Sequence, residues 1–287
     1  MSDVTTTSAL ETVTITTRRG IESEVLVGGP EAGAPVVFLH GFTGHLGGEE
    51  MLAALAAAGL RVHAPVWPGY GEASSETRIE DMLDFTLHGA DVVEALGLGP
   101  AHGRQAPHLI GHSMGGMIAG EMAAVAPYGY GRLVLVAPLG LWLDDSPIPD
   151  IYSLLPFEFP PMLFSDVERG IQLLAGGGVD FDDVEAIKRF LIGNSRRLGT
   201  AGKIMFPIPN RRLSKRLYRI TNPTLLVWGS DDRLLGAEYA AAWQAAITAS
   251  QLETIGSAGH MAPYEKPVEV AQAIARFLSP IDDSASS

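Results

Sequence analysis

The sequence predicts an α/β protein whose mostly parallel central sheet is flanked by helices, with a β-hairpin at its N-terminus and a helical lid inserted in its second half. Short apolar runs alternate with longer amphipathic or alanine-rich stretches from residue 35 onward. Strands that are buried on both faces of a parallel sheet are apolar throughout, and the intervening helices provide the crossover connections. The alternation therefore favours a helix-flanked parallel sheet.

The N-terminal hairpin is predicted from two β-like runs, residues 13–17 and 24–27, on either side of Arg18-Arg19-Gly20. The strands expected after the hairpin are residues 35–39, 61–64, 108–110, 133–136, 225–228 and 251–255. The helices expected between and after these strands are residues 49–58, 79–96, 116–126 and 237–249, with a last helix that starts near residue 267.

The alternation stops between residues 141 and 220, where repeated prolines interrupt short amphipathic pieces. We interpret this segment as a lid inserted into a core that is formed by residues 1–140 and 221–287. Acidic residues gather in residues 144–185 and basic residues in residues 188–219, so the two halves can neutralise each other as solvated surface charge. The alternative is a basic rim that attracts anionic substrates, centred on Arg196, Arg197, Arg211 and Arg212.

The composition excludes several classes of function. A formal net charge of −13 disfavours nucleic-acid binding, which requires clustered Lys and Arg side chains. The absence of cysteine excludes disulfides, thiol nucleophiles and thiolate metal sites. The sequence also has no His-Glu-x-x-His motif and no phosphate-binding glycine loop. We therefore expect no metal, no cofactor and a small-molecule substrate.

The N-terminal residues and the lengths of the apolar runs give an expectation for location. Residues 1–13 are rich in Thr and Ser and lack the basic and apolar regions of a secretory signal. No apolar run reaches the roughly 18 residues of a membrane span. We expect a cytoplasmic protein without a membrane partner, and the sequence leaves open its assembly into a homo-oligomer.

The pentapeptide Gly111-His112-Ser113-Met114-Gly115 matches the pattern G-x-S-x-G. It follows the apolar run 107–110 and precedes the helical stretch 116–126, and a nucleophile elbow requires this order of strand, sharp turn and helix. In such a turn the serine adopts a strained backbone conformation, and the flanking glycines avoid clashes between the strand and the helix. Ser113 is therefore the candidate nucleophile, with its hydroxyl near a helix N-terminus that favours developing negative charge.

With this motif the chain resembles the α/β-hydrolase family, in particular its serine esterases and C–C bond hydrolases, from about Val36 to Phe277. The resemblance implies the α/β-hydrolase fold and a Ser-His-Asp catalytic triad. It also implies that residues 40–44, His-Gly-Phe-Thr-Gly, form an oxyanion loop, so that the Phe42 and Met114 amides donate to one oxyanion. An ordinary turn at the end of a strand is the alternative interpretation of residues 40–44.

His260 is the expected general base. It lies in a loop, residues 256–260, between the last expected strand and the last helix, and the family keeps its histidine there in the order serine, acid, histidine. The acid is expected within residues 229–233, which contain both Asp231 and Asp232, and the resemblance favours Asp232. Its carboxylate would fix the imidazole tautomer and stabilise the imidazolium. Two other histidines are expected to support the site: His112 beneath the elbow and His40 within its own loop.

The function expected from these residues is hydrolysis of carboxylic esters through an acyl-enzyme on Ser113. C–C bond hydrolysis of the meta-cleavage-product type and lactone hydrolysis use the same residues and stay open, and a non-catalytic ligand-binding protein of the same fold is a further alternative. Aromatic residues of the lid are expected to line a pocket for small, mainly apolar or aromatic substrates, the alternative being that they hold the lid on the core. These residues are Trp142, Tyr152, Phe157, Phe164 and Phe206.

Overall fold

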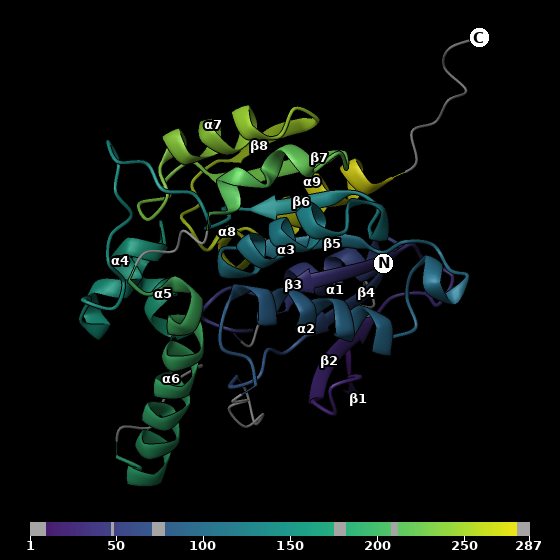
Figure 1. The fold of residues 1–287 in the computed structure, drawn as a ribbon. Helices are drawn as coiled ribbons and strands as arrows, with labels where there is room; N and C mark the ends of the chain where they lie inside the picture. The colour runs from purple at the N-terminus through teal and green to yellow at the C-terminus, as the bar shows by residue number, and fades with distance from the viewer. Residues whose placement is uncertain (1–9, 47–48, 71–77, 175–181, 208–211, 280–287) are drawn as a thin grey trace, which may run out of the picture.

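The computed structural model describes residues 10–46, 49–70, 78–174, 182–207 and 212–279. Within these ranges an eight-stranded sheet has the order β1-β2-β4-β3-β5-β6-β7-β8 (Figure 1). The strands are β1 (Glu11–Thr16), β2 (Glu22–Gly28), β3 (Pro35–Leu39), β4 (Arg61–Pro65), β5 (His108–His112), β6 (Leu133–Val136), β7 (Thr224–Gly229) and β8 (Ser250–Ile255). The pairs β1–β2 and β2–β4 are antiparallel, and all the other pairs are parallel. The predicted mostly parallel sheet and its N-terminal hairpin are confirmed.

Helices cover both faces of the sheet (Figure 1). Leu133 and Leu135 of β6 pack in one apolar cluster with the α2, α3 and α7 helices, whereas Val134 and Val136 pack in a second cluster with α1 and α9. The strands in the middle of the sheet are thus apolar on both faces, as their sequence pattern predicted. The α-helices of this core are α1 (Glu50–Ala57), α2 (Met82–Ala95), α3 (Met114–Val125), α7 (Ala237–Ala246), α8 (Ala262–Glu265) and α9 (Pro267–Leu278). Short 3-10 helices are η1 (Pro100–His102), η2 (Pro127–Gly129), η3 (Pro156–Glu158), η4 (Leu213–Lys215) and η5 (Leu217–Arg219).

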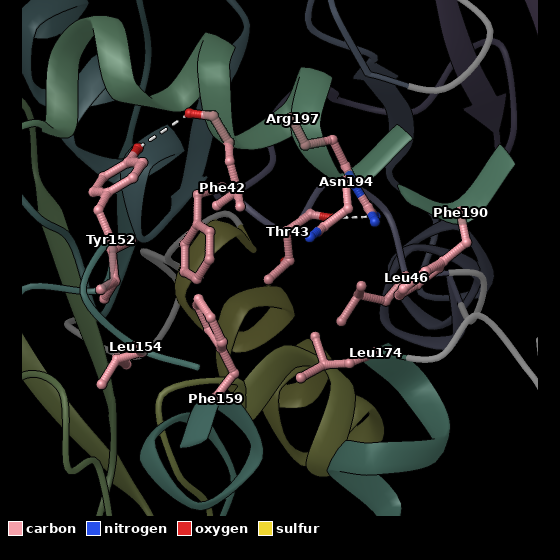
Figure 2. A pocket seen from close by; sticks show the side chains of 12 residues that line it. Phe42, Thr43, Leu46, Tyr152, Leu154, Phe159, Leu174, Phe190, Asn194 and Arg197 are labelled. Atoms are coloured by element: carbon pink, nitrogen blue, oxygen red, sulfur yellow. Dashed lines mark hydrogen bonds between the residues drawn. The ribbon is translucent and has the colours of Figure 1, made fainter. Parts of the chain in front are cut away.

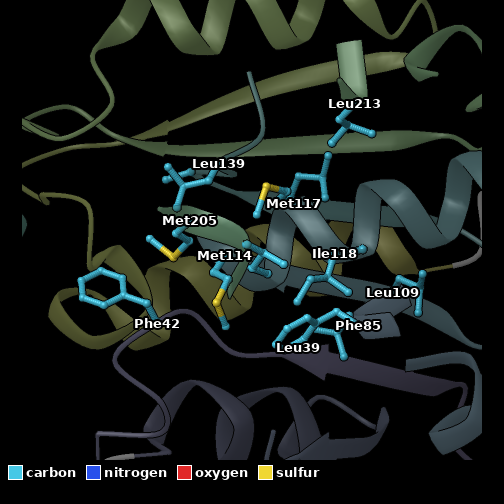
Figure 3. Packing of buried hydrophobic residues seen from close by; sticks show 14 of the residues in the cluster. Leu39, Phe42, Phe85, Leu109, Met114, Met117, Ile118, Leu139, Met205 and Leu213 are labelled. Atoms are coloured by element: carbon cyan, nitrogen blue, oxygen red, sulfur yellow. The ribbon is translucent and has the colours of Figure 1, made fainter. Parts of the chain in front are cut away.

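Helix α3 is buried along almost its whole length because nearly all of its residues are small or apolar. Met114, Met117 and Ile118 of α3 lie with Leu39 of β3 and Phe85 of α2 in one packed cluster (Figure 3). This packing fixes the N-terminus of α3 above the sheet. Neither α3 nor any other helix in the described ranges is both long and apolar enough to cross a bilayer.

Three helices, α4 (Phe159–Leu163), α5 (Val167–Leu174) and α6 (Val184–Met205), lie beyond the carboxyl ends of the parallel strands (Figure 1). The sequence predicted only short pieces here, but α6 is a single helix of 22 residues. The Asp183 side chain caps the start of α6 by accepting a hydrogen bond from the Glu185 amide, and Ala201 and Ile204 are buried near the other end of this helix. The cap and this burial outweigh the unfavourable effect of the glycines within α6. The role of these helices as a lid stays a prediction.

Candidate active site

Ser113 stands at the turn between β5 and α3. Its backbone has φ 55° and ψ −118°, a conformation that strains a residue with a side chain by about 1–3 kcal/mol. Hydrogen bonds hold this turn in place. The Ser113 amide donates to the Val136 carbonyl over 2.9 Å, and the Ser113 carbonyl accepts from the amides of Met117 and Leu139, both at 3.1 Å. The sheet and the helix together therefore impose the strained turn that carries the hydroxyl.

Two glycines of the motif allow the strand, the turn and the helix to approach closely. A Cβ atom at Gly111 would lie 2.5 Å from the Gly115 carbonyl oxygen and 2.7 Å from the Cα atom of Gly116. A Cβ atom at Gly115 would overlap the Leu39 carbonyl oxygen and lie 2.5 Å from the His40 carbonyl oxygen. A side chain at either position would push α3 away from the sheet, so both positions require glycine.

Ser113, His260 and Asp232 form a continuous hydrogen-bonded run. His260 Nε2 lies 2.8 Å from Ser113 Oγ, and His260 Nδ1 lies 2.9 Å from Asp232 Oδ2. Ser113 and His260 are 0% exposed, and the side chain of Asp232 is 1% exposed. When Nδ1–H donates to the carboxylate, Nε2 is left as the acceptor for the serine hydroxyl. This arrangement can take the proton from Ser113 as its oxygen attacks an electrophile.

The two neighbouring aspartates face in different directions. Asp232 Oδ2 contacts His260, and its Oδ1 accepts from two backbone amides further along the loop, at 2.9 and 2.8 Å. Asp231 is exposed and accepts from two serine hydroxyls, of which that of Ser165 is 2.6 Å away. These hydroxyls, with Ser165 first, lower the pKa of Asp231. The structure brings Asp232 to His260 and turns Asp231 away from it.

Two further histidines brace the site. His112 Nε2 donates to the His260 carbonyl oxygen over 2.9 Å, and burial, followed by the nearby His260, lowers the pKa of His112 to about 3. His40 Nδ1 donates to the Gly41 carbonyl over 2.8 Å, its Nε2 accepts from the Trp67 amide at 3.1 Å, and burial lowers its pKa well below the ordinary value. Burial thus favours the neutral form of both rings, and both are hydrogen-bonded to backbone. Among the described residues, no three His, Asp or Glu side chains gather in a way that would hold a metal ion.

The loop of residues 40–44 packs directly against the elbow. A Cβ atom at Gly41 would lie 3.1 Å from Ser113 Cβ, and the Gly44 amide donates to the Gly41 carbonyl over 3.1 Å, which closes a tight turn. Phe42 follows Gly41 in this turn. Met114 is the first residue of α3, where a helix leaves its amides without intrahelical acceptors. The structure therefore places the Phe42 and Met114 backbones next to Ser113.

The fold agrees with comparisons to known proteins. A family model described as the alpha/beta hydrolase family matches residues 36–273. The chain belongs to the alpha/beta hydrolase family. It is similar to monoacylglycerol lipase ABHD6 of Mus musculus, with 26% identity over 264 residues that cover 87% of this chain and 76% of that protein. It is also similar to 2-hydroxy-6-oxo-6-phenylhexa-2,4-dienoate hydrolase of Comamonas testosteroni, with 27% identity over 265 residues that cover 86% of this chain and 88% of that protein.

A solved structure shares the fold of this alpha/beta hydrolase. A membrane phospholipase A, described as a bacterial virulence factor, superimposes with a TM-score of 0.76 at 21% sequence identity, covering 94% of this chain and 86% of that chain. At this identity the likeness concerns the fold alone. The family and fold that the sequence predicted are both confirmed.

Phe42 lines a mainly apolar pocket of the hydrolase that has a volume of about 200 Å³ (Figure 2). The Phe42 ring lies against that of Phe159 in α4, with 6.3 Å between the ring centroids. Phe42 follows Gly41, where an added Cβ atom would lie 3.1 Å from Ser113 Cβ, so one wall of the pocket belongs to the loop that packs against the elbow. The side chains of the pocket come from the loop after β3 and from the inserted segment: Phe42, Thr43, Leu46, Ile151, Tyr152, Leu154, Phe159, Leu174, Phe190, Asn194, Arg197 and Leu198.

Arg197 of α6 is the cationic residue of this pocket (Figure 2). Its Nη1 donates to the Thr43 carbonyl over 3.2 Å, and burial lowers its pKa. No carboxylate of the described residues forms an ion pair with it. Arg216, in contrast, pairs with the buried carboxylate of Glu121. Arg197 thus places a positive charge in an otherwise mostly apolar pocket of the hydrolase.

Tyr152 lines the pocket, as the sequence predicted, but the other four predicted aromatic residues lie outside it. Phe157 is 72% exposed and Phe206 is 52% exposed. Phe164 is buried and packs on Gly170, and the Trp142 indole donates to Asp144 over 3.1 Å. Phe164 also belongs to the apolar cluster that contains Leu39 and Met114, so it holds the inserted segment on the core, as the alternative interpretation has it.

Some residues at this site were not indicated by the sequence. Glu265 is buried in α8, five residues after His260, and its carboxylate accepts from three backbone amides. A lone glutamate in a short helix has no pattern that distinguishes it from a surface residue. Asn194 and Phe190 belong to α6, whose continuous helical register was not predicted, so their common face could not be found.

Proposed function

We propose that this hydrolase cleaves carboxylic esters through an acyl-enzyme formed on Ser113. The observation that carries the proposal is the run of hydrogen bonds from Ser113 through His260 to Asp232. Ser113 Oγ bonds to the carbonyl carbon while its proton passes to His260 Nε2, and Asp232 stabilises the imidazolium. The ester C–O bond then breaks, and His260 returns the proton to the leaving alcohol. Water, with His260 as base, next releases the carboxylic acid and restores Ser113.

The Phe42 and Met114 amides are proposed to donate to the oxyanion of the tetrahedral intermediate. Both backbones lie next to Ser113, and the positive end of the α3 dipole points to the same place. Such donors are fixed before the charge develops, and each contributes about 3–4 kcal/mol to the stability of the transition state. The loop of residues 40–44 would then serve catalysis as well as the connection from β3 to α1.

The pocket beside Phe42 supports a small substrate with an apolar or aromatic group. Its volume of about 200 Å³ and its mostly apolar wall suit a short to medium acyl chain or a single ring. Because Ser113 is 0% exposed, the residues that cover it must move before a substrate can reach its hydroxyl. Tyr152, Phe159 and Leu174 come from the inserted segment and line the pocket, so we propose that this segment acts as the lid.

C–C bond hydrolysis is the second candidate function, because it would use the same three residues. The name of the Mus musculus relative supports ester cleavage, whereas the name of the Comamonas testosteroni relative supports cleavage of a dienoate. Lactone hydrolysis is compatible with the same nucleophile. A non-catalytic ligand-binding role ranks below these, since Ser113, His260 and Asp232 are in contact.

A fluorophosphonate probe tests the nucleophile directly. The wild type should be labelled and the Ser113→Ala variant should not, whereas equal labelling of both would refute a serine enzyme. A panel of p-nitrophenyl esters, compared with 2-hydroxy-6-oxo-6-phenylhexa-2,4-dienoate, then ranks the reactions. If kcat/KM for the dienoate is orders of magnitude larger than for the esters, C–C bond hydrolysis becomes the first candidate function in place of ester hydrolysis.

Two expectations about the surroundings of the protein stay predictions, a small-molecule substrate and a cytoplasmic location, and its assembly into a homo-oligomer stays open. Gel filtration with light scattering measures the oligomeric state. Fractionation of the native host with an antibody measures the location.

A further inference from the structure

Residues 161–166, named here the bridging segment, span the end of α4 and its link to α5, and they contact the loop that carries Asp232. The Arg233 guanidinium donates to the Pro161 carbonyl over 2.7 Å. Ser165 Oγ donates to Asp231 Oδ2 over 2.6 Å. Because Arg233 and Asp231 stand on either side of Asp232, the bridging segment holds this loop from both sides of the proposed acid.

The same segment contacts the loop that carries His260. The Met261 amide donates to the Leu163 carbonyl over 3.1 Å. A Cβ atom at Gly259 would lie 2.7 Å from the Leu163 carbonyl oxygen and 2.8 Å from the Ser165 amide nitrogen, so the two backbones touch. Since Gly259 and Met261 stand on either side of His260, the proposed base is also held from both sides.

Glu265 joins these contacts. It is 6% exposed, and its Oε1 accepts from the amides of Ser165 and Asp166 at 2.7 and 3.0 Å. Its Oε2 accepts from the Gly259 amide at 2.7 Å. A buried carboxylate is tolerated only where such donors replace water, and bonds to a charged acceptor are stronger than neutral ones. One carboxylate thus ties the bridging segment to the residue before His260.

We propose that the bridging segment and Glu265 set the distance between the Asp232 carboxylate and the His260 imidazole, with Glu265 as a positioning residue. The acid and the base come from separate loops, and the bridging segment gives both loops a common support. This inference rests on the proposed function, because it concerns the same proton transfer. It also extends the role of the inserted segment from covering the site to aligning it.

The Glu265→Gln variant tests the inference. An amide has one acceptor oxygen, so either the Gly259 amide or the Ser165 and Asp166 amides lose their acceptor. On p-nitrophenyl butyrate we expect kcat to fall by about 10- to 100-fold with little change in KM, because small displacements of reacting groups reduce rates on this scale. The acidic limb of the pH–rate profile should move to lower pH, since the imidazolium loses part of its contact with the carboxylate. The Glu269→Gln variant, which removes an exposed carboxylate from α9, is the matched control and should behave like the wild type.

A second readout does not depend on turnover. The His260 Nδ1 proton, bonded to a buried carboxylate, should give a far-downfield proton NMR signal that shifts or broadens in Glu265→Gln. If the wild type neither hydrolyses esters nor reacts with the fluorophosphonate, but this signal is present and responds to Glu265→Gln, the proposed function fails and the positioning inference stands. If kcat falls while the pH profile and the NMR signal match the wild type, the positioning inference is wrong.

The Ser165→Ala variant covers the case in which Glu265→Gln does not fold. It removes only the hydroxyl that bonds Asp231, and we expect kcat to fall by about three- to tenfold with an unchanged KM. The same pH profile and NMR signal are measured. Wild-type values for both readouts would overturn the proposed role of the bridging segment.

Discussion

Asp232 Oδ2 lies 2.9 Å from His260 Nδ1, whereas the carboxylate of its neighbour Asp231 bonds the hydroxyl of Ser165. The two residues have the same chemistry and are adjacent in the chain. Their surroundings differ, because Asp232 is turned into the protein and Asp231 into solvent. This difference assigns the two carboxylates different roles in the proposed mechanism.

The first prediction compares Asp232→Asn with Asp231→Asn. In Asp232→Asn the amide no longer stabilises the imidazolium and favours the wrong imidazole tautomer, so kcat should fall by about 10⁴-fold, as in other serine triads. In Asp231→Asn the amide oxygen still accepts from Ser165, so kcat should stay within about tenfold of the wild type. Steady-state kinetics on p-nitrophenyl butyrate measures both values. Equal losses in the two variants would contradict the assignment of the acid.

Much of the core could be predicted because its signals are local. The apolar runs marked β3, β6 and β7 to within a residue or two, since a strand buried on both faces has no polar interior position. The nucleophile elbow was predicted from glycine, serine and glycine at a fixed spacing between a strand and a helix. This pattern is typical of a strained turn, and Ser113 has φ 55° there. The acid was harder to predict, since spacing alone does not tell which of Asp231 and Asp232 turns inward.

The pocket could not be predicted in the same way because its residues meet only after the chain has folded. Thr43 and Leu46 follow β3, whereas Asn194 and Arg197 lie on α6, about 150 residues later. An aromatic residue in the inserted segment can face the pocket, the core or solvent. Phe164 packs in the core cluster, and no pattern in its proline-interrupted surroundings distinguishes these outcomes.

The second prediction concerns two glycines in different surroundings. Alanine at Gly115 would overlap the Leu39 carbonyl, so Gly115→Ala should lower the free energy of unfolding by about 3 kcal/mol or more. Gly199 lies within α6, and no described residue outside this helix comes within 4 Å of the place that an alanine methyl group would take. Gly199→Ala should therefore raise the free energy of unfolding by about 0.5–1 kcal/mol. Urea unfolding followed by circular dichroism measures both, and a destabilised Gly199→Ala variant would argue against a continuous α6.

The third prediction concerns acid sensitivity. Burial, followed by the nearby His260, lowers the pKa of His112 from 6.5 to about 3. Unfolding restores the ordinary pKa, so the unfolded state binds the proton more readily below pH 6.5. The stability that depends on neutral His112 is therefore complete above pH 6.5, and it is lost as the pH falls toward 3, by about 1.4 kcal/mol per pH unit.

The His112→Gln variant tests this dependence because its amide still donates to the His260 carbonyl but does not take up a proton. The free energy of unfolding of this variant is measured in urea from about pH 7.5 to 4.5. It should decline less steeply with falling pH than that of the wild type, and the two slopes should differ by about 1.4 kcal/mol per pH unit. Replacement of the exposed His102 by Gln is the control and should leave the slope unchanged. A wild-type slope in His112→Gln would mean that another group is responsible for the acid sensitivity.

The last prediction concerns the charge in the pocket. Arg197 lines the pocket and donates to the Thr43 carbonyl, with no ion-pair partner among the carboxylates of the described residues. A guanidinium without a carboxylate partner in partly desolvated surroundings should bind an acyl group that ends in a carboxylate, because a charge-assisted hydrogen bond contributes about twice as much as a neutral one. The Arg197→Met variant should therefore lower kcat/KM for p-nitrophenyl hydrogen glutarate by about 10- to 100-fold relative to p-nitrophenyl pentanoate.

Arg196 offers a matched control because it stands one residue earlier on α6 and is exposed. The Arg196→Met variant removes the same charge outside the pocket, so the ratio of kcat/KM for the two esters should change by less than about twofold, as surface charges are screened by salt. Equal effects of the two variants would indicate that the summed basic charge of α6, rather than a contact with Arg197, attracts the anion. If the wild type has a larger kcat/KM for the glutarate ester than for the pentanoate ester, its preferred substrates are dicarboxylate monoesters and not esters of apolar acyl groups.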